Sequence, residues 1–219
     1  MSTGIQPEPG NDSLAEQAYR LLEEQLVTLK LSPGKLITEK SLMDKAGIGR
    51  TPVREAIQRL SAEGLLRVIP RKGLMVTPLR RSDLRQIIEA RRVLERLMVV
   101  KAAERATPDQ RRALETLAGQ IGSVGNDLEV FFRHDQSLNK LLEAACHNQF
   151  LVKALSVMHS QCRRLWYMNR RTLDLPRSVQ LHEGLARSVA QGNGAGAIRA
   201  LDEIIAILED LVNGLDELS

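Results

Sequence analysis

The chain is poor in aromatic residues and in cysteine. Aromatics make up 3% of its 219 residues, whereas Leu, Ile, Val and Ala supply most of a hydrophobic fraction of 43%. Such a composition favours packed helices over strands, which are enriched in aromatic and β-branched residues. Two cysteines, Cys146 and Cys162, are too few for a disulfide framework. The absences exclude a disulfide-stapled scaffold and disfavour a strand-rich domain.

Long apolar runs are missing too. No segment approaches the roughly 18 apolar residues of a membrane span. The N-terminal sequence MSTGIQPEPGND lacks the apolar core of a secretory signal. We therefore expect a cytoplasmic protein without a membrane partner. Because residues 1–12 are polar and contain proline and glycine, we expect them to form a disordered tail.

Positive charge is concentrated in one part of the chain. The net charge is +4, yet residues 35–80 alone hold ten lysines and arginines against four acids. The remainder is close to neutral. This distribution is typical of a nucleic-acid-binding domain joined to a domain with a second function.

The basic segment has the pattern of a helix-turn-helix followed by a hairpin. A helix predicted over about 39–45 precedes the turn Gly47-Ile48-Gly49. The second helix is predicted to have Thr51 as its cap and Pro52 at its first position, and to end at Gly64. Its buried face is Val53, Ala56, Ile57 and Leu60, and its other side carries Arg50, Arg54, Gln58 and Arg59. Strands over 65–69 and 74–77 flank a basic tip, Pro70-Arg71-Lys72-Gly73.

A helix with arginines on its outer face is, by itself, most often a solvated surface helix. The ordered succession of helix, glycine turn, basic helix and basic hairpin instead predicts a winged helix, whose second helix suits the major groove of DNA. We assign the winged helix-turn-helix to residues 13–78, including a first helix that begins at Ser13 and ends near residue 30. Residues 79–81 are the expected linker.

Residues 82–219 have a helical pattern throughout. Helices are predicted over about 82–105, from 107, 128–146, 149–171, 176–191 and 195–215. Thr107, Pro108 and Gln110 form a clear helix start. Short connections between such helices predict an antiparallel bundle. The fold class is mainly α, with a small β-hairpin in the N-terminal domain.

Two sets of motifs point to a known family. The N-terminal set is Pro33-Gly34, Leu36, Glu39, Leu42, Gly47, Arg50-Thr51-Pro52-Val53-Arg54-Glu55-Ala56, Leu60, Glu63-Gly64-Leu65 and Gly73. The C-terminal set is Arg91-Arg92-Val93-Leu94-Glu95, then Asp135, Leu138, Leu142, Ala145 and Asn148, then His182-Glu183-Gly184-Leu185. With the first set the chain resembles the GntR family of bacterial winged-helix regulators, and with the second the FCD ligand domain of its FadR-type branch.

The resemblance implies a dimeric, nucleoid-associated transcription regulator, usually a repressor. The winged helix would bind a palindromic operator in double-stranded DNA, and the helical domain would dimerise and hold a small effector, often a carboxylate. The DNA contacts expected from the resemblance and from charge are Lys40, Arg50, Thr51, Arg54, Arg59, Arg71, Lys72 and Gly73. Arginine suits bidentate bonds to guanine, whereas Lys40, Arg59, Arg71 and Lys72 suit phosphates.

The resemblance also raises the question of a metal. Many FCD domains hold a divalent ion with an aspartate, a histidine four residues on and two later histidines. The matching positions here are Asp135, Asn139, His182 and about Ile204. One carboxylate, one amide and one imidazole make a weak zinc site. Two interpretations stay open. Asp135, Asn139 and His182 form either a degraded site for zinc, nickel or manganese, or a metal-free pocket in which they bind the effector directly.

Arg91 is the residue expected to bind an anionic effector, because a guanidinium pairs bidentately with a carboxylate. The alternative is a salt bridge to Glu95, one helical turn on. The pairs Cys146-His147 and His159-x-x-Cys162 do not have the spacing of a zinc finger.

Two other functions compete with the regulator. A non-specific architectural DNA-binding protein would bind DNA with a steep salt dependence and no sequence preference. A metal-dependent enzyme is the weaker alternative, because the sequence has no nucleophile elbow, Walker loop or paired catalytic carboxylates. We therefore predict that the chain is not an enzyme.

Overall fold

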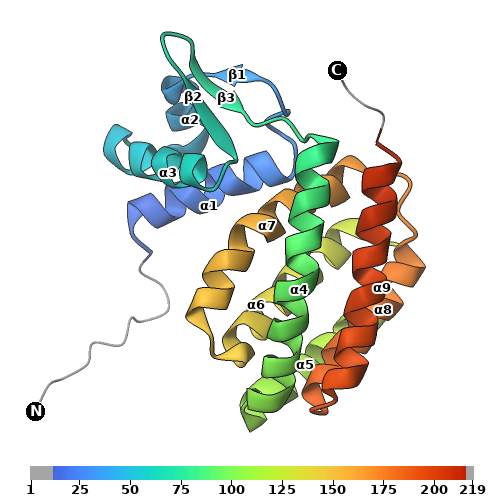
Figure 1. Cartoon of the computed structure of the whole chain (residues 1–219). Coiled ribbons are helices and arrows are strands. Elements are labelled where there is room, and N and C mark those ends of the chain that lie inside the picture. The colour runs from blue at the N-terminus through green and yellow to red at the C-terminus, as the bar shows by residue number, and fades with distance from the viewer. Residues whose placement is uncertain (1–11, 216–219) are drawn as a thin grey trace, which may run out of the picture. The chain divides into compact units, whose positions relative to one another are not determined.

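A computed structural model describes residues 12–215 of the chain, which divides into two compact units after Pro78. Both units are built mainly from helices, and the first also contains a small sheet (Figure 1). The predicted fold class is confirmed. Except for Asp12, the predicted N-terminal tail lies outside the described residues.

The first unit is a three-helix core closed by a three-stranded sheet. Its elements are α1 (Leu14–Val27), β1 (Leu36–Ile37), α2 (Glu39–Ala46), α3 (Arg50–Ala62), β2 (Leu66–Ile69) and β3 (Gly73–Val76). The sheet order is β1-β3-β2 and both pairs are antiparallel, with Leu74 opposite Ile37 on one side and Val68 on the other. β1 was not predicted, because two residues are too few to show strand alternation.

The buried face of α3 is the predicted one. Val53, Ala56, Ile57 and Leu60 are buried in the core of the first unit. The predicted start of α3 is wrong, because Gly49 is the N-cap and Thr51 lies in the first turn. Gly47 reverses the chain in the left-handed conformation at φ +65°, and the helix begins two residues earlier than predicted. No side chain caps α3, which leaves its first-turn amides available to an anion.

The second unit is a bundle of helices. They are α4 (Arg81–Arg105), α5 (Pro108–Gly122), α6 (Leu128–Cys146), α7 (Gln149–Met168), α8 (Leu175–Ala190) and α9 (Gly194–Asn213). Thr107 and Gln110 form the predicted capping box. α4 begins at Arg81, so the last residue of the expected linker belongs to the helix, and α7 ends three residues before the predicted Arg171.

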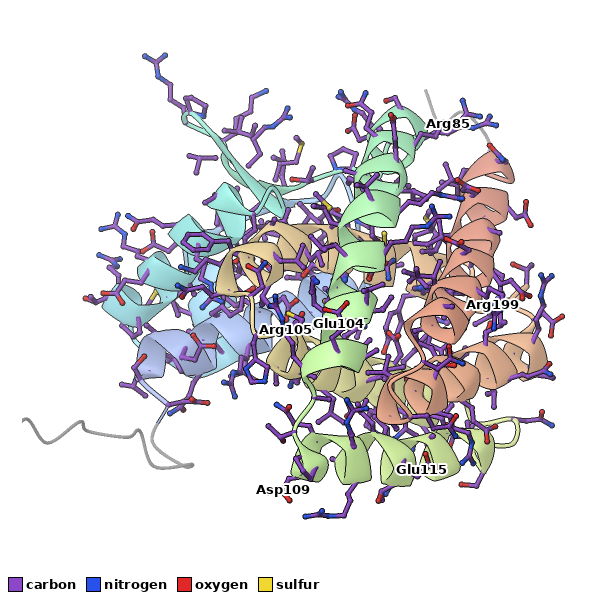
Figure 2. The ribbon with its side chains drawn as sticks, turned by 60° about the horizontal axis from the view of Figure 1, so that its bottom comes forward. Arg85, Glu104, Arg105, Asp109, Glu115 and Arg199 are labelled. Atoms are coloured by element: carbon purple, nitrogen blue, oxygen red, sulfur yellow. The ribbon has the colours of Figure 1, made fainter. Side chains whose placement is uncertain are left out.

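Within the bundle α4 packs against α9 and α5 against α8 (Figure 1). Charged side chains such as Glu104 on α4, Glu115 on α5 and Arg199 on α9 project from the outer surface (Figure 2). Across residues 12–215 no helix is both long and apolar enough to cross a membrane.

Gly73 is the glycine that the wing requires. It has φ +103°, and a Cβ there would lie 2.8 Å from the Ile37 carbonyl oxygen of the neighbouring strand. We expect Gly73→Ala to reduce the free energy of unfolding of the winged unit by about 1–3 kcal/mol, because both the φ angle and β1 must move. Urea unfolding of the intact protein measures this loss.

Gly49→Ala is the matched control for this substitution. Gly49 has φ −66°, and a Cβ there meets no atom within 4 Å, so only the poorer capping by alanine should reduce stability, by less than at Gly73. Equal urea midpoints for the two variants would contradict the role given to Gly73.

Candidate nucleic-acid interface and ligand pocket

A groove of about 590 Å³ separates α3 from the β2–β3 hairpin. Its lining is Glu39, Arg54, Ile57, Gln58, Val68, Ile69, Pro70, Arg71, Gly73 and Leu74. The groove thus brings Arg54 of α3 together with Arg71 and Gly73 of the wing. Lys72 is exposed beside them at the wing tip, and Lys40 is exposed on α2.

One carboxylate holds two arginines of α3. Glu39, the first residue of α2, accepts a hydrogen bond from Nε of Arg54 at 3.0 Å. Its other oxygen lies 3.4 Å from Nε of Arg50. The arginine side chains remain 73% and 64% exposed at positions 50 and 54, so both can reach a ligand while Glu39 restricts their directions. Thr51 is exposed in the same first turn.

Glu39 is a functional candidate that sequence reasoning missed. An acid in the first turn of a helix is ordinarily explained by the helix dipole alone. Only the packing of α2 against α3 shows that its carboxylate faces Arg50 and Arg54.

Arg59 has a different environment from the other predicted DNA contacts. Its guanidinium lies 3.5 Å from the centre of the Tyr19 ring, a cation–π contact. It also donates to Glu16 of α1 at 2.8 Å and to Glu63 at 3.2 Å, and the Tyr19 hydroxyl donates to Glu63 at 2.8 Å. These contacts fasten α1 to α3. The phosphate contact of Arg59 stays a prediction.

The wing tip holds an arginine in a glycine-like conformation. The Lys72 amide donates to the Ile69 carbonyl at 3.0 Å, and Arg71 between them has φ +62°. A non-glycine residue in this region carries conformational strain, which is typical of functional sites. The turn places the Arg71 side chain at the tip of the wing.

The four predicted effector residues meet in the second unit. Arg91, Asp135, Asn139 and His182, from α4, α6 and α8, line one cavity of about 10 Å³. The rest of the lining is Glu95 and the aliphatic residues Met98, Val99, Leu138, Leu142, Leu185, Leu201 and Ile204. This volume holds about one water molecule. It is too small for a metabolite in this conformation.

Asp135 and His182 form a buried pair in this cavity. Nδ1 of His182 donates to the Ser178 carbonyl at 2.7 Å, and Nε2 lies 3.3 Å from Oδ1 of Asp135. Asn139 donates to the same oxygen at 3.4 Å. Burial would raise the pKa of the Asp135 carboxyl, but the hydrogen bond and charge of His182 and the charges of nearby arginines lower it below its ordinary value. Asp135 therefore stays ionised at neutral pH.

The donor set does not fit a zinc ion. Within residues 12–215 no three His, Cys, Asp or Glu side chains are grouped to hold a metal. Asn139 offers only a neutral oxygen, and the position of the family's last ligand is the buried aliphatic side chain of Ile204.

Arg91 is held in a chain of buried charges. Its Nε lies 2.7 Å from Glu95, the predicted alternative partner. The other Glu95 oxygen lies 2.7 Å from Nε2 of His159, whose Nδ1 is 3.4 Å from Glu143. Burial would lower the pKa of His159, but its hydrogen bonds to Glu143 and Glu95 raise that pKa above its ordinary value, which favours the charged form of the ring. Burial would raise the pKa of Glu95, but Arg91 and His159 lower it. Only the Arg91–Glu95 pair could be predicted from sequence spacing, because His159 and Glu143 lie on other helices.

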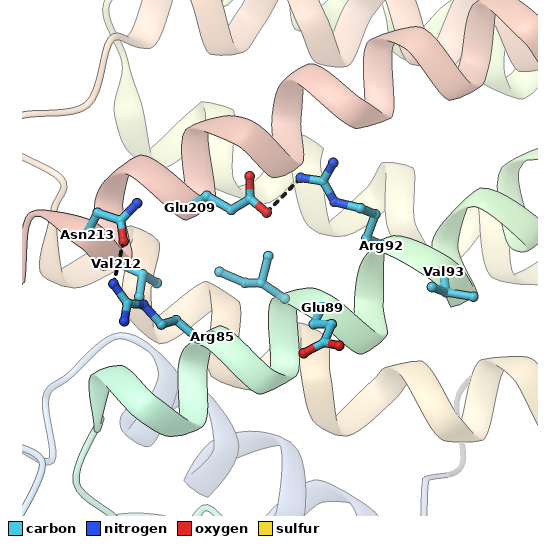
Figure 3. A pocket seen from close by; sticks show the side chains of 8 residues that line it. Arg85, Glu89, Arg92, Val93, Glu209, Val212 and Asn213 are labelled. Carbon is cyan, nitrogen blue, oxygen red and sulfur yellow. Dashed lines mark hydrogen bonds and ion pairs between the residues drawn. The ribbon is translucent and has the colours of Figure 1, made fainter.

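The outward face of α4 is apolar as well. Val93 and Leu97, one turn apart, are 68% and 44% exposed. Val93 borders a groove of about 410 Å³ between α4 and α9, whose other lining residues are Arg85, Ile88, Glu89, Arg92, Glu209, Val212 and Asn213 (Figure 3). Arg92 pairs with Glu209 at 2.7 Å across this groove. A helix that is apolar on two faces is ordinarily packed on both.

Comparison with known proteins decides the family. Residues 14–76 match the bacterial regulatory proteins of the gntR family, and residues 86–206 match the FCD domain. The chain belongs to the GntR family of transcription regulators. This confirms the predicted resemblance, and the described geometry is that of a GntR winged helix followed by an FCD domain.

Relatives cover nearly the whole chain. The HTH-type transcriptional regulator LutR of Bacillus subtilis is 26% identical over 86% of this chain and 96% of its own. The HTH-type transcriptional repressor RspR of Escherichia coli is 24% identical over 90% of this chain and 88% of its own. The solved structure of E. coli McbR/YncC has a TM-score of 0.81 over 93% of this chain and 98% of its own, and at 22% identity it supports the fold alone. GntR regulators bind DNA, FCD domains bind small-molecule effectors, and such regulators are not enzymes.

Removing the Glu39 carboxylate tests whether it orients the side chains of Arg50 and Arg54. We expect Glu39→Gln to bind random duplex DNA several-fold more tightly, because non-specific affinity follows charge. The preference for a selected operator should shrink, because the arginines lose their fixed direction. Fluorescence anisotropy measures both, with an operator selected by the wild-type protein from a random pool and a shuffled duplex.

Asp44→Asn makes the same charge change at an exposed position of α2. It should tighten binding to both duplexes and leave their ratio unchanged. The role of Glu39 is refuted if its variant behaves like this control.

Proposed function

We propose that this GntR regulator is an effector-controlled repressor that binds a palindromic operator as a homodimer, through α3 and the wing. The observation that carries the proposal is the pair of exposed arginines, Arg50 and Arg54, held by Glu39 beside the basic wing. The relative RspR is itself a repressor by name.

In this proposal α3 lies in the major groove. Arg50 and Arg54 would bond guanine O6 and N7, worth roughly 1–3 kcal/mol each in discrimination. The uncapped first turn of α3, with Thr51, would bind a phosphate together with Lys40, and Arg71 and Lys72 would bind the backbone beside the wing. The phosphate contacts set register, and the two arginines read sequence.

The effector would bind in the cavity beside Arg91. Its carboxylate would contact the guanidinium, while Asp135, Asn139 and His182 contact it directly. Because the donor set does not fit zinc, we propose a pocket that works without metal. The proposed effector is therefore recognised by side chains of the chain alone.

Regulation would be a shift between two populations. The described cavity admits about one water, so an effector favours a conformation in which the helices around it are further apart. α4 lines the cavity and begins three residues after the winged unit ends at Pro78. A movement of α4 would change the spacing of two winged units on an operator.

The homodimer would form through the outward face of α4. Val93 and Leu97 expose apolar surface there, one helical turn apart. In an antiparallel pairing of two copies about the point between them, Val93 of one copy comes next to Leu97 of the other. A self-complementary patch of this kind is what a two-fold interface needs.

Substitutions at Arg54 and Lys72 distinguish sequence-specific DNA binding from non-specific DNA binding. Arg54→Ala should lose about 5- to 150-fold in operator affinity, equivalent to roughly 1–3 kcal/mol, with little change on shuffled DNA. Lys72→Ala should weaken binding to both duplexes alike and reduce the slope of affinity against salt by about one. Anisotropy titrations at several salt concentrations test both, and an equal loss on both duplexes for Arg54→Ala would remove its role in reading sequence.

The α4 interface makes its own prediction. Val93→Glu combined with Leu97→Glu should convert the dimer to a monomer in sedimentation velocity, because four charges would face each other across the two-fold axis. Val68→Glu, at an equally exposed apolar position in the wing, should leave the dimer intact. A double variant that still sediments as the wild-type dimer would exclude this surface.

A further inference from the structure

The outward surface of α3 carries a polar side chain to which the proposed function gives no role. Gln58 is exposed one helical turn after Arg54, and both residues line the groove between α3 and the wing. Within residues 12–215 the Gln58 side chain has no hydrogen-bond partner. The donor and the acceptor of its amide are therefore both open to a ligand in this groove.

The exposed residues next to Gln58 on α3 do not share this position. Arg59 follows it directly, but the Arg59 guanidinium lies 3.5 Å from the centre of the Tyr19 ring and donates to Glu63 at 3.2 Å. Glu55 is exposed as well, yet it does not line the groove. Apart from the guanidinium of Arg54, the amide of Gln58 is thus the polar group that α3 contributes to the described lining of the groove.

A glutamine amide matches one base edge better than the others. In the major groove adenine presents an acceptor, N7, beside a donor, the N6 amino group, and a glutamine amide can bond both at once. Guanine presents two acceptors, N7 and O6, which suit a guanidinium because it has five donors and no acceptor. An amide beside the arginines therefore favours an adenine beside the guanines.

Helix geometry gives the position of this adenine relative to the guanines. Arg50, Arg54 and Gln58 follow one another at intervals of four residues, which advance a helix by about 6 Å each. This advance is close to two base steps of about 3.4 Å. Long side chains on a helix lean toward its N-terminus, so the amide of Gln58 is expected to extend toward the turn that carries Arg54. The three side chains should meet the base pairs in the same order as they follow in the chain.

We infer that Gln58 determines part of the operator sequence by bonding an adenine through its N6 and N7 atoms. This adenine lies within about two base pairs of the guanine that Arg54 bonds, on the side away from Arg50. The inference rests on the proposed function in taking α3 as the helix that enters the major groove. It adds one base of stated identity to each half-site.

Selection of operators from a random pool of duplexes locates this adenine. The pool is selected separately with the full-length wild type, Arg54→Ala and Gln58→Ala. Arg54→Ala should lose the preference for one guanine. Gln58→Ala should keep that guanine and lose the preference for one adenine within about two base pairs of it. Because Gln58 is exposed and alanine is a strong helix former, this variant should fold as the wild type does.

A modified base then tests the contact at a single atom. 7-Deazaadenine still pairs with thymine but has a carbon in place of N7. At the selected adenine it should weaken binding of the wild type about 5-fold or more in fluorescence anisotropy. Gln58→Ala should bind the modified and unmodified duplexes equally, because it has already lost the contact. Gln17→Ala makes the same substitution at an exposed position of α1, and 7-deazaadenine should weaken its binding as much as that of the wild type.

Three results would overturn the inference. They are a selected half-site without an adenine near that guanine, wild-type binding that 7-deazaadenine leaves unchanged, and a loss in Gln58→Ala as large as in the wild type. If Arg54→Ala still loses its guanine in these cases, only the role of Gln58 is refuted and sequence-specific binding through α3 stands. A pool from which the wild type selects no operator refutes the proposed function itself.

Discussion

Arg91 and Glu95 lie one turn apart on the buried face of α4, with the paired atoms 2.7 Å apart. Removing such ions from water costs several kcal/mol each, and only a close partner for every charge offsets that cost. Glu95 uses its second oxygen for His159, and His159 uses its second nitrogen for Glu143. The result is a chain of charges that links α4 with α7 and α6, and it sets the positions these helices take around the cavity.

Helix α4 takes part in three of the proposed contacts. Its inner face carries Arg91 and Glu95 into the cavity, its outer face exposes Val93 and Leu97, and its first turn follows the winged unit along the chain. A ligand that changes the partners of Arg91 or Glu95 therefore acts on a helix that is also the proposed dimer contact. In the proposed mechanism ligand binding and half-site spacing both depend on α4, so a ligand that favours one position of this helix also favours one spacing.

Local sequence signals predicted most elements of the fold. Cap and periodicity patterns placed α5 and α6 correctly and identified the buried face of α3. These patterns failed where the signal was short or ambiguous. Strand β1 has only two residues, too few to show alternation. Thr51 precedes a proline and so resembles an N-cap, but Gly49 is the N-cap.

The sites depend more on contacts between distant segments. Family motifs were enough to group Asp135, Asn139 and His182, which the structure places in one cavity. No local sequence pattern shows that Arg59 stacks on Tyr19, which lies 40 residues earlier in the chain. Nor does one show that His159 lies between Glu95 and Glu143. The small volume of the cavity likewise follows from how the helices pack. Because a ligand needs more room than this, we propose that the domain has a second conformation.

We propose that ligand binding and operator binding are coupled in this protein. We would measure the affinity of the intact protein for its selected operator and for the shuffled duplex at about 0.15 M salt, with and without a small carboxylate that raises its Tm. We expect a clear preference for the operator and a change in operator affinity of about 5-fold or more when the ligand is present, which is the usual lower range of allosteric coupling. An operator affinity that stays the same when the ligand saturates the protein would contradict it.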